Sequence, residues 1–367
     1  MMNKMIVSNL AHRPVRSAIS ILAIALEVVL ILLIVGLSIG MLNDSRSRQA
    51  GIGADVIVLP PSSSNIVGIT GAPMPVKIAD LIRPLPHVAV VSPVLLQVST
   101  AGSLQTIDGI DLPSFEALRS FTYVQGGPFE APNDILVDDI YSNGNHVRVG
   151  DTVNLFNHSF RIAGIVAHGK GARVFLPLAT LQDLNGASGR CSAFYVKADS
   201  PENAAQIVHE IKTIPNMGSY VVQSMNDYLA TFTPDHLPMF STFIRIVIGI
   251  AVTIGFIVIF QAMYAAVMER TREIGILKSL GASKLYIVNV ILRETTLLAL
   301  GGVVVGIAIS FATKSGIRER VPTLPIEINA GWVARAVVIA IVGSLAGAIY
   351  PAFKAAQKDP IDALAYE

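Results

Sequence analysis

Four stretches of the chain are almost entirely apolar and carry very few charges. They cover residues 17–42, 240–267, 285–312 and 332–353. Because an α-helix rises about 1.5 Å per residue, about 20 apolar residues suffice to cross the roughly 30 Å of hydrocarbon in a bilayer. The pattern therefore predicts four transmembrane helices, one near the N-terminus and three in the C-terminal part of the chain.

The long region between the first two stretches, 43–239, alternates short β-branched and aromatic runs with Gly, Pro and Asn. Runs such as DVIVLP and SAFYVKA are typical of strands, and the residues between them are typical of turns. Two helices are expected, around 113–120 and 201–213, the second after the start signal Ser-Pro-Glu. The segment 60–75 fits either a mobile loop or a simple linker. We predict a membrane protein with four transmembrane α-helices in a 1 + 3 arrangement and a mixed α/β extracytoplasmic domain between helices 1 and 2.

Lys and Arg residues in the short loops indicate the orientation, because cytoplasmic loops carry an excess of them. With the N-terminus inside, nine such residues flank the inner ends of the spans and five flank the outer ends. Both termini are therefore expected in the cytoplasm, in a multi-pass protein of the inner (plasma) membrane. The first span is expected to be a retained anchor, because its apolar run is about twice as long as that of a signal peptide.

The expected organisation follows from these spans and this orientation. In chain order it comprises a cytoplasmic N-terminal segment at 1–16, transmembrane helix 1 at 17–42, the extracytoplasmic domain at 43–239, transmembrane helix 2 at 240–267, a cytoplasmic segment with a short helix at 268–284, transmembrane helix 3 at 285–312, an outer loop at 313–331, transmembrane helix 4 at 332–353 and a cytoplasmic tail at 354–367.

The composition agrees with a membrane protein. Of the 367 residues, 52% are hydrophobic and only 14% are charged, whereas charged residues make up about a quarter of a soluble protein. The formal net charge of +1 gives no indication of nucleic-acid binding. The single cysteine, Cys191, excludes an intrachain disulfide and a cysteine metal cluster.

Two short motifs begin like binding signatures but depart from them. Residues 164–170 have the GxxxxGK spacing of a P-loop, but Gly171 stands where Ser or Thr must hold magnesium, and a strand-like run follows in place of a helix. His209 and Glu210 begin like a zinc protease motif, but Thr213 replaces the second histidine ligand. We found no paired nucleophile and base, and therefore expect no enzyme, no catalytic residue, no metal and no cofactor in this chain.

Some polar and small residues lie inside the predicted spans. Glu27 falls near the bilayer centre, where an ionised carboxylate costs about 2.5–3.5 kcal/mol, and Glu294 poses the same problem in the third span. Either carboxylate fits a functional polar contact or a locally satisfied structural charge, and we hypothesise that Glu27 lines a subunit interface. Three GxxxG pairs are suited to close helix packing in lipid: Gly36 with Gly40, Gly302 with Gly306, and Gly343 with Gly347.

The segment ERTREIGILKSLGASK, 269–284, separates two apolar stretches. Two oppositely charged pairs at i,i+3 spacing support a helix there, Glu269 with Arg272 and Arg270 with Glu273. An apolar stripe follows, formed by Ile274, Leu277 and Leu280, and Gly281 is suited to end the helix. Such a helix presents charged and apolar side chains together, which fits a contact with a soluble partner or a loop lying on the lipid surface.

These residues resemble a known family. The stretch MERTREIGILKSLGAS, 268–283, closely resembles the cytoplasmic signature of ABC transporter permeases of the MacB/FtsX type, whose compact members include the lipoprotein-release and DevC-like permeases. Glu294 with the glycines at 301, 302 and 306 resembles the third span of that family. The ends of the chain, NLAHRPVRSAISILAIAL and YPAFKAAQKDPIDALAYE, resemble its start of span 1 and its C-terminal pattern.

The resemblance implies a permease subunit that works as a homodimer with a separate cytoplasmic ABC ATPase dimer, which would bind ATP and magnesium. It implies mechanotransmission, in which ATP-driven motion passes through the spans to the extracytoplasmic domain. It also allows a periplasmic adaptor or another outer-face protein as a partner, with membrane lipid around the spans and no nucleic acid. The residues expected to couple to the ATPase are Glu269, Arg270, Arg272, Glu273, Gly275, Lys278, Gly281 and Ala282.

Two functions fit the resemblance. The first is a permease that exports or extracts an amphipathic cargo, such as a lipid, lipoprotein, peptide or haem. The alternative is an FtsX-like signalling subunit that activates a cell-wall hydrolase and transports nothing. An apolar cavity or groove between the extracytoplasmic domains would favour the transporter, and a protein-binding surface would favour the signalling subunit. The sequence does not name the cargo.

Overall fold

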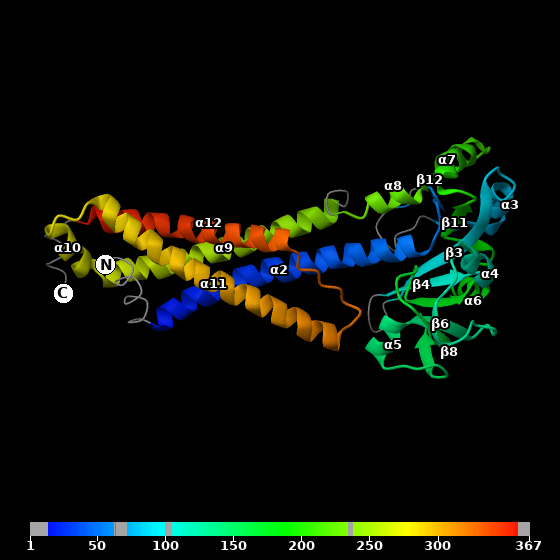
Figure 1. Cartoon of the computed structure of the whole chain (residues 1–367), viewed down its shortest axis with the longest axis horizontal. Coiled ribbons are helices and arrows are strands. Elements are labelled where there is room, and N and C mark those ends of the chain that lie inside the picture. The colour runs from blue at the N-terminus through cyan, green and yellow to red at the C-terminus, as the bar shows by residue number, and fades with distance from the viewer. Residues whose placement is uncertain (1–13, 62, 64–71, 100–104, 234–237, 359–367) are drawn as a thin grey trace. The chain divides into compact units, whose positions relative to one another are not determined.

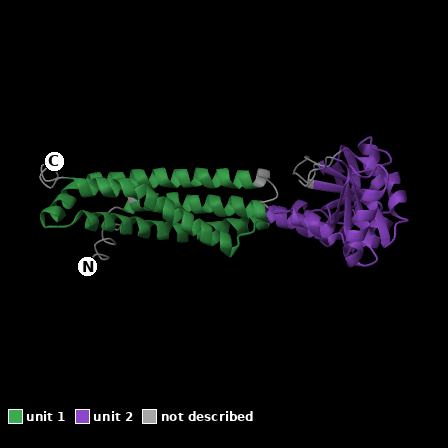
Figure 2. Cartoon of the chain, turned by 90° about the horizontal axis from the view of Figure 1, so that it is seen from above, with its two compact units in different colours: residues 1–39, 239–319, 326–367 green, residues 40–238, 320–325 purple. Residues whose placement is uncertain are grey.

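The computed structural model of the chain describes residues 14–61, 63, 72–99, 105–233 and 238–358. The chain divides into two compact units (Figure 2), of which the first comprises residues 1–39, 239–319 and 326–367 and the second residues 40–238 and 320–325. Most of the predicted N-terminal segment, the middle of the predicted loop 60–75 and the last residues of the predicted tail lie outside the described residues.

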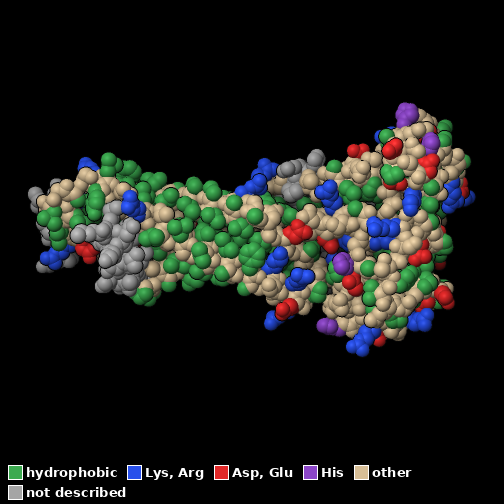
Figure 3. Space-filling model, in the orientation of Figure 1, with side chains coloured by type: hydrophobic (Ala, Val, Ile, Leu, Met, Phe, Trp, Pro, Cys, Tyr) green, Lys and Arg blue, Asp and Glu red, His purple; other side chains and the backbone are tan. Residues whose placement is uncertain are grey.

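The first unit is a bundle of long helices joined by one short helix (Figure 1). Its helices are α2 (Pro14–Gly51), which continues into the second unit, α9 (Pro238–Glu269), α10 (Thr271–Ser279), α11 (Lys284–Arg320) and α12 (Ala330–Gln357). Four of these are long and apolar enough to cross a membrane, one N-terminal and three C-terminal. Hydrophobic side chains cover most of the visible bundle surface (Figure 3). The 1 + 3 arrangement is therefore confirmed.

Two of the helices extend by nine and eight residues past the ends that the sequence predicted. α2 continues to Gly51, where residue 42 was the expected end, and α11 continues to Arg320, where residue 312 was the expected end. The added residues are polar, so hydrophobicity alone does not reveal them. A helix satisfies its backbone hydrogen bonds internally, and polar side chains at its end are no obstacle once it leaves the apolar part of the bundle.

Glycines bring the helices of the bundle close together. A Cβ at Gly302 or Gly306 of α11 would lie 2.6 Å and 2.8 Å from α2 atoms of Ile24 and Val28, and a Cβ at Gly347 of α12 would lie 2.8 Å from the backbone of α9. Gly36 differs, because it faces the extended segment before α12, where the Glu327 N–H donates to its carbonyl at 2.9 Å. These glycines pack within one chain, as small residues do in membrane bundles.

The second unit is built on a mixed sheet. The strand order is β12-β1-β11-β3-β4-β9-β6-β8-β5, with β7 paired to β8, and β4·β9 and β6·β8 are parallel. The strands of this sheet are β1 (Val56–Leu59), β3 (Val88–Ser99), β4 (Gln105–Ile110), β5 (Tyr123–Gly126), β6 (Asp134–Asp138), β7 (Thr152–Leu155), β8 (His158–Val166), β9 (Val174–Pro177), β11 (Ala193–Ala198) and β12 (Val221–Ser224). A separate pair joins β2 (Met74–Pro75) to β10 (Arg190–Cys191).

Short helices cover the sheet on both faces. They are η1 (Val76–Ile78), α3 (Ala79–Ile82), α4 (Leu112–Leu118), α5 (Asp139–Asn145), α6 (Leu178–Leu184), η2 (Pro201–Asn203), α7 (Ala204–Thr213) and α8 (Met225–Ala230). Alternation along β1 shows the two faces, since Val56 and Val58 pack with α3 and α7 while Ile57 and Leu59 pack with α4 and α8. A strand buried on both faces is apolar throughout, which explains the run VIVL. Helices around 113–120 and 201–213 were predicted, and α4 and the η2–α7 segment confirm them.

A candidate coupling site around helix α10

The sequence of α10 accounts for both ends of this short helix. The Thr271 hydroxyl donates to the Met268 carbonyl at 2.9 Å. Glu273 lies in the first turn and Lys278 in the last, where each charge interacts favourably with the helix dipole. At the C-terminus Gly281 has a φ of 93°, and the Ala282 N–H donates to the Leu277 carbonyl at 3.0 Å. This is the backbone pattern of a glycine-terminated helix, so the predicted helix end at Gly281 is confirmed.

Arg270 fixes the beginning of α10 to α11. Its guanidinium lies 3.0 Å from the carboxylate of Glu294, and the two side chains are 13% and 3% exposed. A buried carboxylate needs such a partner, because an unpaired charge away from water is costly. Glu294, one of the two predicted intramembrane acids, is therefore satisfied by a residue that the resemblance assigned to the ATPase contact.

Lys278 fixes the other end of α10 to α12. Its ammonium donates to the Ala356 carbonyl at 3.1 Å and to the Lys358 carbonyl. These carbonyls belong to the last turn of α12 and to its C-cap residue, where a cation is favourable. Arg270 and Lys278 thus tie α10 to two spans.

The outward face of α10 is mixed in character. Glu269, Arg272 and Glu273 are exposed, and the apolar side chains of Ile276 and Leu280 are 45% and 79% exposed. The predicted apolar stripe is therefore split, because its first member is buried and its last, Leu280, lies at the surface. Gly275 is buried in the helix and Ala282 is half-buried after it. A surface of charged groups around large apolar side chains is typical of a protein contact.

A groove lies beside this face. It has a volume of about 460 Å³ and runs between the end of α9, α10 and the beginning of α11. Its lining includes Ile276 and Leu277 from α10, Tyr286 from α11, and the Arg270–Glu294 pair. The groove is mostly apolar with a few polar groups, which is the usual character of a binding site.

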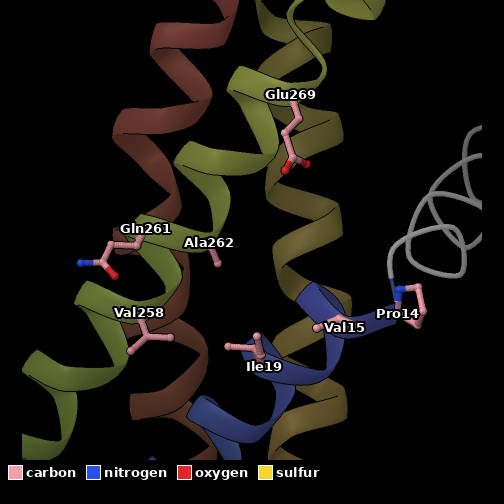
Figure 4. Close-up of a pocket in the computed structure, with 7 residues that line it drawn as sticks. All are labelled: Pro14, Val15, Ile19, Val258, Gln261, Ala262 and Glu269. Carbon is pink, nitrogen blue, oxygen red and sulfur yellow. The ribbon is translucent and has the colours of Figure 1, made fainter.

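A second hollow lies between α2 and α9, and Figure 4 shows the residues that line it. It has a volume of about 530 Å³. Val15 and Ile19 of α2 and Val258 and Ala262 of α9 give it an apolar lining, and Glu269 lies at one end. Val15 and Ile19 are 73% and 55% exposed, so this crevice is open at the surface of the bundle.

The end of α2 is fixed within the second unit by ion pairs that the sequence did not reveal. Arg173 lies 3.1 Å from Asp44 of α2 and 3.0 Å from Asp138, and its side chain is 8% exposed. Burial raises the pKa of Asp138 although this guanidinium is near. Arg48 of α2 donates to the Gly171 carbonyl at 2.8 Å, and the Gly171 N–H donates to the Arg48 carbonyl at 2.8 Å. We refer to this group of contacts as the α2 joint.

The glycine-rich segment 164–170 belongs to this joint. A Cβ at Gly51, the last residue of α2, would overlap the carbonyl of Gly169. Lys170 donates to the Arg119 carbonyl, and its ammonium lies 4.0 Å from the centre of the Phe121 ring, while burial lowers its pKa to about 8. A strand, β9, follows the segment, so it lacks the helix N-terminus of a P-loop, as predicted.

Asp108 is a further buried acid at the joint. Its carboxyl accepts the Ala172 N–H at 3.1 Å, while its other oxygen has no partner. Burial raises its pKa to about 7, although the charge of Arg48 acts in the opposite direction. The sequence does not indicate these joint residues, because they are single charges in different elements. Only the fold brings them together.

Two family models match the chain. The description of the first is a MacB-like periplasmic core domain, and it matches residues 17–214, more than half of the chain. The second is an FtsX-like permease C-terminal domain, and it matches residues 245–360, which include all of α10.

Curated proteins with similar sequences agree with these models. The uncharacterized ABC transporter permease YknZ of Bacillus subtilis (strain 168) is 35% identical over 48% of this chain and 43% of its own length. The putative hemin transport system permease protein HrtB of Staphylococcus haemolyticus is 21% identical over 66% of each chain. The macrolide export ATP-binding/permease protein MacB of Bdellovibrio bacteriovorus is 23% identical over 98% of this chain and 60% of its own length.

The chain thus covers between 43% and 66% of the length of these relatives. The two family matches together include the N-terminal span, the sheet domain and all three C-terminal spans. The chain is a multi-pass membrane protein, and it belongs to the MacB/FtsX family of ABC transporter permeases.

Proposed function

We propose that the chain is the permease subunit of an ABC exporter or extractor powered by a separate ATPase subunit. The observation that carries this proposal is the construction of α10: its inner side is tied to α11 through Arg270 and to α12 through Lys278, and its outer side exposes charged and apolar residues. Links to two spans on one side and an exposed mixed surface on the other are what a helix that passes a displacement to the spans requires.

In this proposal the exposed face of α10 docks on the ATPase. Arg272 and Glu273 supply charge, and Ile276 and Leu280 supply apolar area that is exposed in the single chain. Movement of the ATPase would shift α10, and the Arg270–Glu294 pair and the Lys278 contacts would pass the shift to α11 and α12. Both termini and α10 lie in the cytoplasm in this arrangement.

The path outward runs through α2. This helix packs on α11 at Gly302 and Gly306, and it is continuous from Pro14 to Gly51. Its last turns are held by the α2 joint, where Arg173 contacts both Asp44 and Asp138. A continuous helix with contacts in each unit would pass a displacement from one to the other, which supports mechanotransmission to the sheet domain. The working complex would contain two copies of the chain and two ATPase subunits.

The crevice between α2 and α9 supports an amphipathic cargo. Its apolar lining suits an acyl chain or another apolar group, and the open side of a membrane bundle is where such a group arrives. A second candidate, the signalling subunit, is supported by a different observation. The sheet domain carries a groove of about 720 Å³ beside Leu112, Phe129 and Leu178, which would suit a protein partner.

The test uses the permease reconstituted in lipid with its ATPase subunit. The double variant Arg272→Ala/Glu273→Ala is expected to weaken the complex about tenfold or more, as loss of about 1.4 kcal/mol of contact energy would do. The control is Arg293→Ala on α11, since Arg293 is exposed and bonds to Asn289 four residues earlier. Equal ATPase binding and equal ATP hydrolysis in both variants and the wild type would refute the docking of α10.

A further inference from the structure

Glu27 lies inside the bundle of the chain itself. Its side chain is 3% exposed on α2, and its Oε1 atom has no hydrogen-bond partner. This differs from the hypothesis that Glu27 lines an interface between subunits, because the chain's own helices α9 and α12 already cover it. No ion pair of Glu27 occurs among the residues that the structure describes.

Two glycines make room for this carboxyl. A Cβ at Gly255 of α9 would overlap the Glu27 carboxylate, and a Cβ at Gly343 of α12 would lie 3.8 Å from Oε1 and 3.8 Å from Val252. Ser344 follows Gly343, but its buried hydroxyl also lacks a partner, so it does not donate to Glu27. The carboxyl is therefore enclosed by glycine backbone and apolar side chains.

No charged group on the neighbouring helices is placed to neutralise Glu27. The titratable residues of these helices stand about two turns or more along each helix from the positions that face α2 near Glu27. Those nearest to these positions along each helix are Arg245 and Tyr264 on α9, Arg335 and Tyr350 on α12, and Glu294 and Lys314 on α11. Of these, Glu294 is ion-paired with Arg270.

An ionised carboxylate in this position would lack both a cation and a hydrogen-bond donor. A charge without such partners is unfavourable both in a protein interior and at the bilayer centre. The neutral acid avoids this cost. Metal binding does not offer an alternative within the described residues, where no group of three His, Cys, Asp or Glu side chains comes together.

We propose that Glu27 is a proton-binding site of the bundle, occupied while α9 packs on α2 at Gly255 and emptied when α9 moves away. The step is a simple ionisation: the carboxylic acid gives its proton to water that enters between the helices, and the carboxylate takes a proton back before the helices close. Only proton release depends on the proposed ATP-driven motion. The protonated state is a property of the packed bundle and needs no ATPase.

The first experiment measures the protonated state directly, on the full-length permease in lipid without an ATPase. Infrared spectroscopy is expected to show the carbonyl band of a protonated carboxylic acid at pH 7, and the Glu27→Gln variant is expected to lack it. Asp108→Asn serves as the control, because it removes another acid with a buried oxygen that lacks a hydrogen-bond partner, and should leave the Glu27 band in place. Glutamate labelled with ¹³C shows whether the band in the wild type comes from a glutamate, even where Glu27→Gln fails to fold. Absence of any protonated glutamate band would overturn the proposal, and would leave the ATPase partnership untouched.

The second experiment tests the link between proton and packing. Gly255→Ala places a methyl group in the space of the Glu27 carboxyl, so that the carboxyl or α9 must move, whereas Gly249→Ala on the same helix places its methyl group where no atom lies within 4 Å. The acid band is expected to be lost, or to exchange at least about tenfold faster in D₂O, in Gly255→Ala and to be unchanged in Gly249→Ala. An unchanged band in a folded Gly255→Ala variant would contradict the coupling. The rate of exchange in the wild type, with and without ATP in the full complex, gives the same test where Gly255→Ala does not fold.

Discussion

The guanidinium of Arg270 lies 3.0 Å from the carboxylate of Glu294, and this buried pair joins the start of α10 to α11. The residue before a short exposed helix is thereby anchored in a span. Any force on the outer face of α10 acts on α11 through a charged contact that is costly to break. We take this pair as the first link between the ATPase contact and the bundle.

Removal of one partner of this pair is expected to destabilise the chain. Arg270→Leu or Glu294→Leu leaves one buried charge without a partner, at a cost of about 3–5 kcal/mol. The double variant Arg270→Leu/Glu294→Leu leaves no charge and should recover most of the loss. Thermal unfolding of the four proteins in one detergent provides the double-mutant cycle. Additive losses in the double variant would show that the two residues act independently.

Close packing of α11 on α2 gives a second prediction. Gly306→Ala places a methyl group 2.8 Å from Val28 and from the Ala25 carbonyl, and overpacking of this kind costs about 1–3 kcal/mol. Gly316→Ala on the same helix meets no atom within 4 Å, and should stabilise by about 0.5–1 kcal/mol because alanine favours helix. Opposite shifts in melting temperature are expected, and equal shifts would contradict the helix packing described.

The buried Asp108 predicts a dependence of stability on pH. Its pKa of about 7 in the folded protein exceeds the ordinary value of 3.8, so the folded state binds the proton more tightly than the unfolded state. Stability is therefore highest below about pH 4 for this group and falls as pH rises toward about 7, by up to roughly 4 kcal/mol. Asp108→Asn should match the wild type at low pH and exceed it at pH 8, as measured by thermal unfolding. Parallel pH profiles of the two proteins would exclude this role.

Lys278 gives a prediction about function. Lys278→Met keeps much of the apolar stem but cannot donate to the carbonyls of Ala356 and Lys358. The link from α10 to α12 is then lost while the exposed face of α10 is unchanged. ATPase binding should persist, and stimulation of ATP hydrolysis by cargo should fall. Lys278→Arg retains donors and serves as the control, and an equal loss in both variants would point to a general disturbance.

Much of the bundle could be predicted from the sequence. Long apolar runs fix the number and order of the spans, and the pairs and glycine of the 269–284 segment indicate a short helix that ends at Gly281. Hydrophobicity does not reveal the polar extensions of the helices. Residues 43–51 have the composition of a loop, but α2 continues through them. β4, QTIDGI, gives a weaker strand signal than the apolar runs, since it contains a glycine and a buried aspartate.

The site was only partly predictable. The sequence picks out α10, but not which of its side chains face inward: Arg270 and Lys278 look like their exposed neighbours, and only the positions of Glu294 and the end of α12 show that they are used within the chain. Asp44, Arg173 and Asp138 illustrate the same limit, because an ion pair between residues 129 apart in sequence has no local signal.

The account depends most on contact between the outer face of α10 and an ATP-binding subunit, and the chain allows a direct measurement. Its one cysteine, Cys191, is fully buried, and burial raises its pKa to about 12, so it will not compete for thiol reagents. Leu280→Cys supplies an accessible thiol on α10, and Val338→Cys, exposed on α12, supplies a matched control. A benzophenone attached to each thiol is then photoactivated in native membranes. The account predicts a crosslink from position 280 to a subunit with Walker motifs and none from position 338. Crosslinking at position 280 to lipid alone, with the ATPase present in the same membranes, would contradict it.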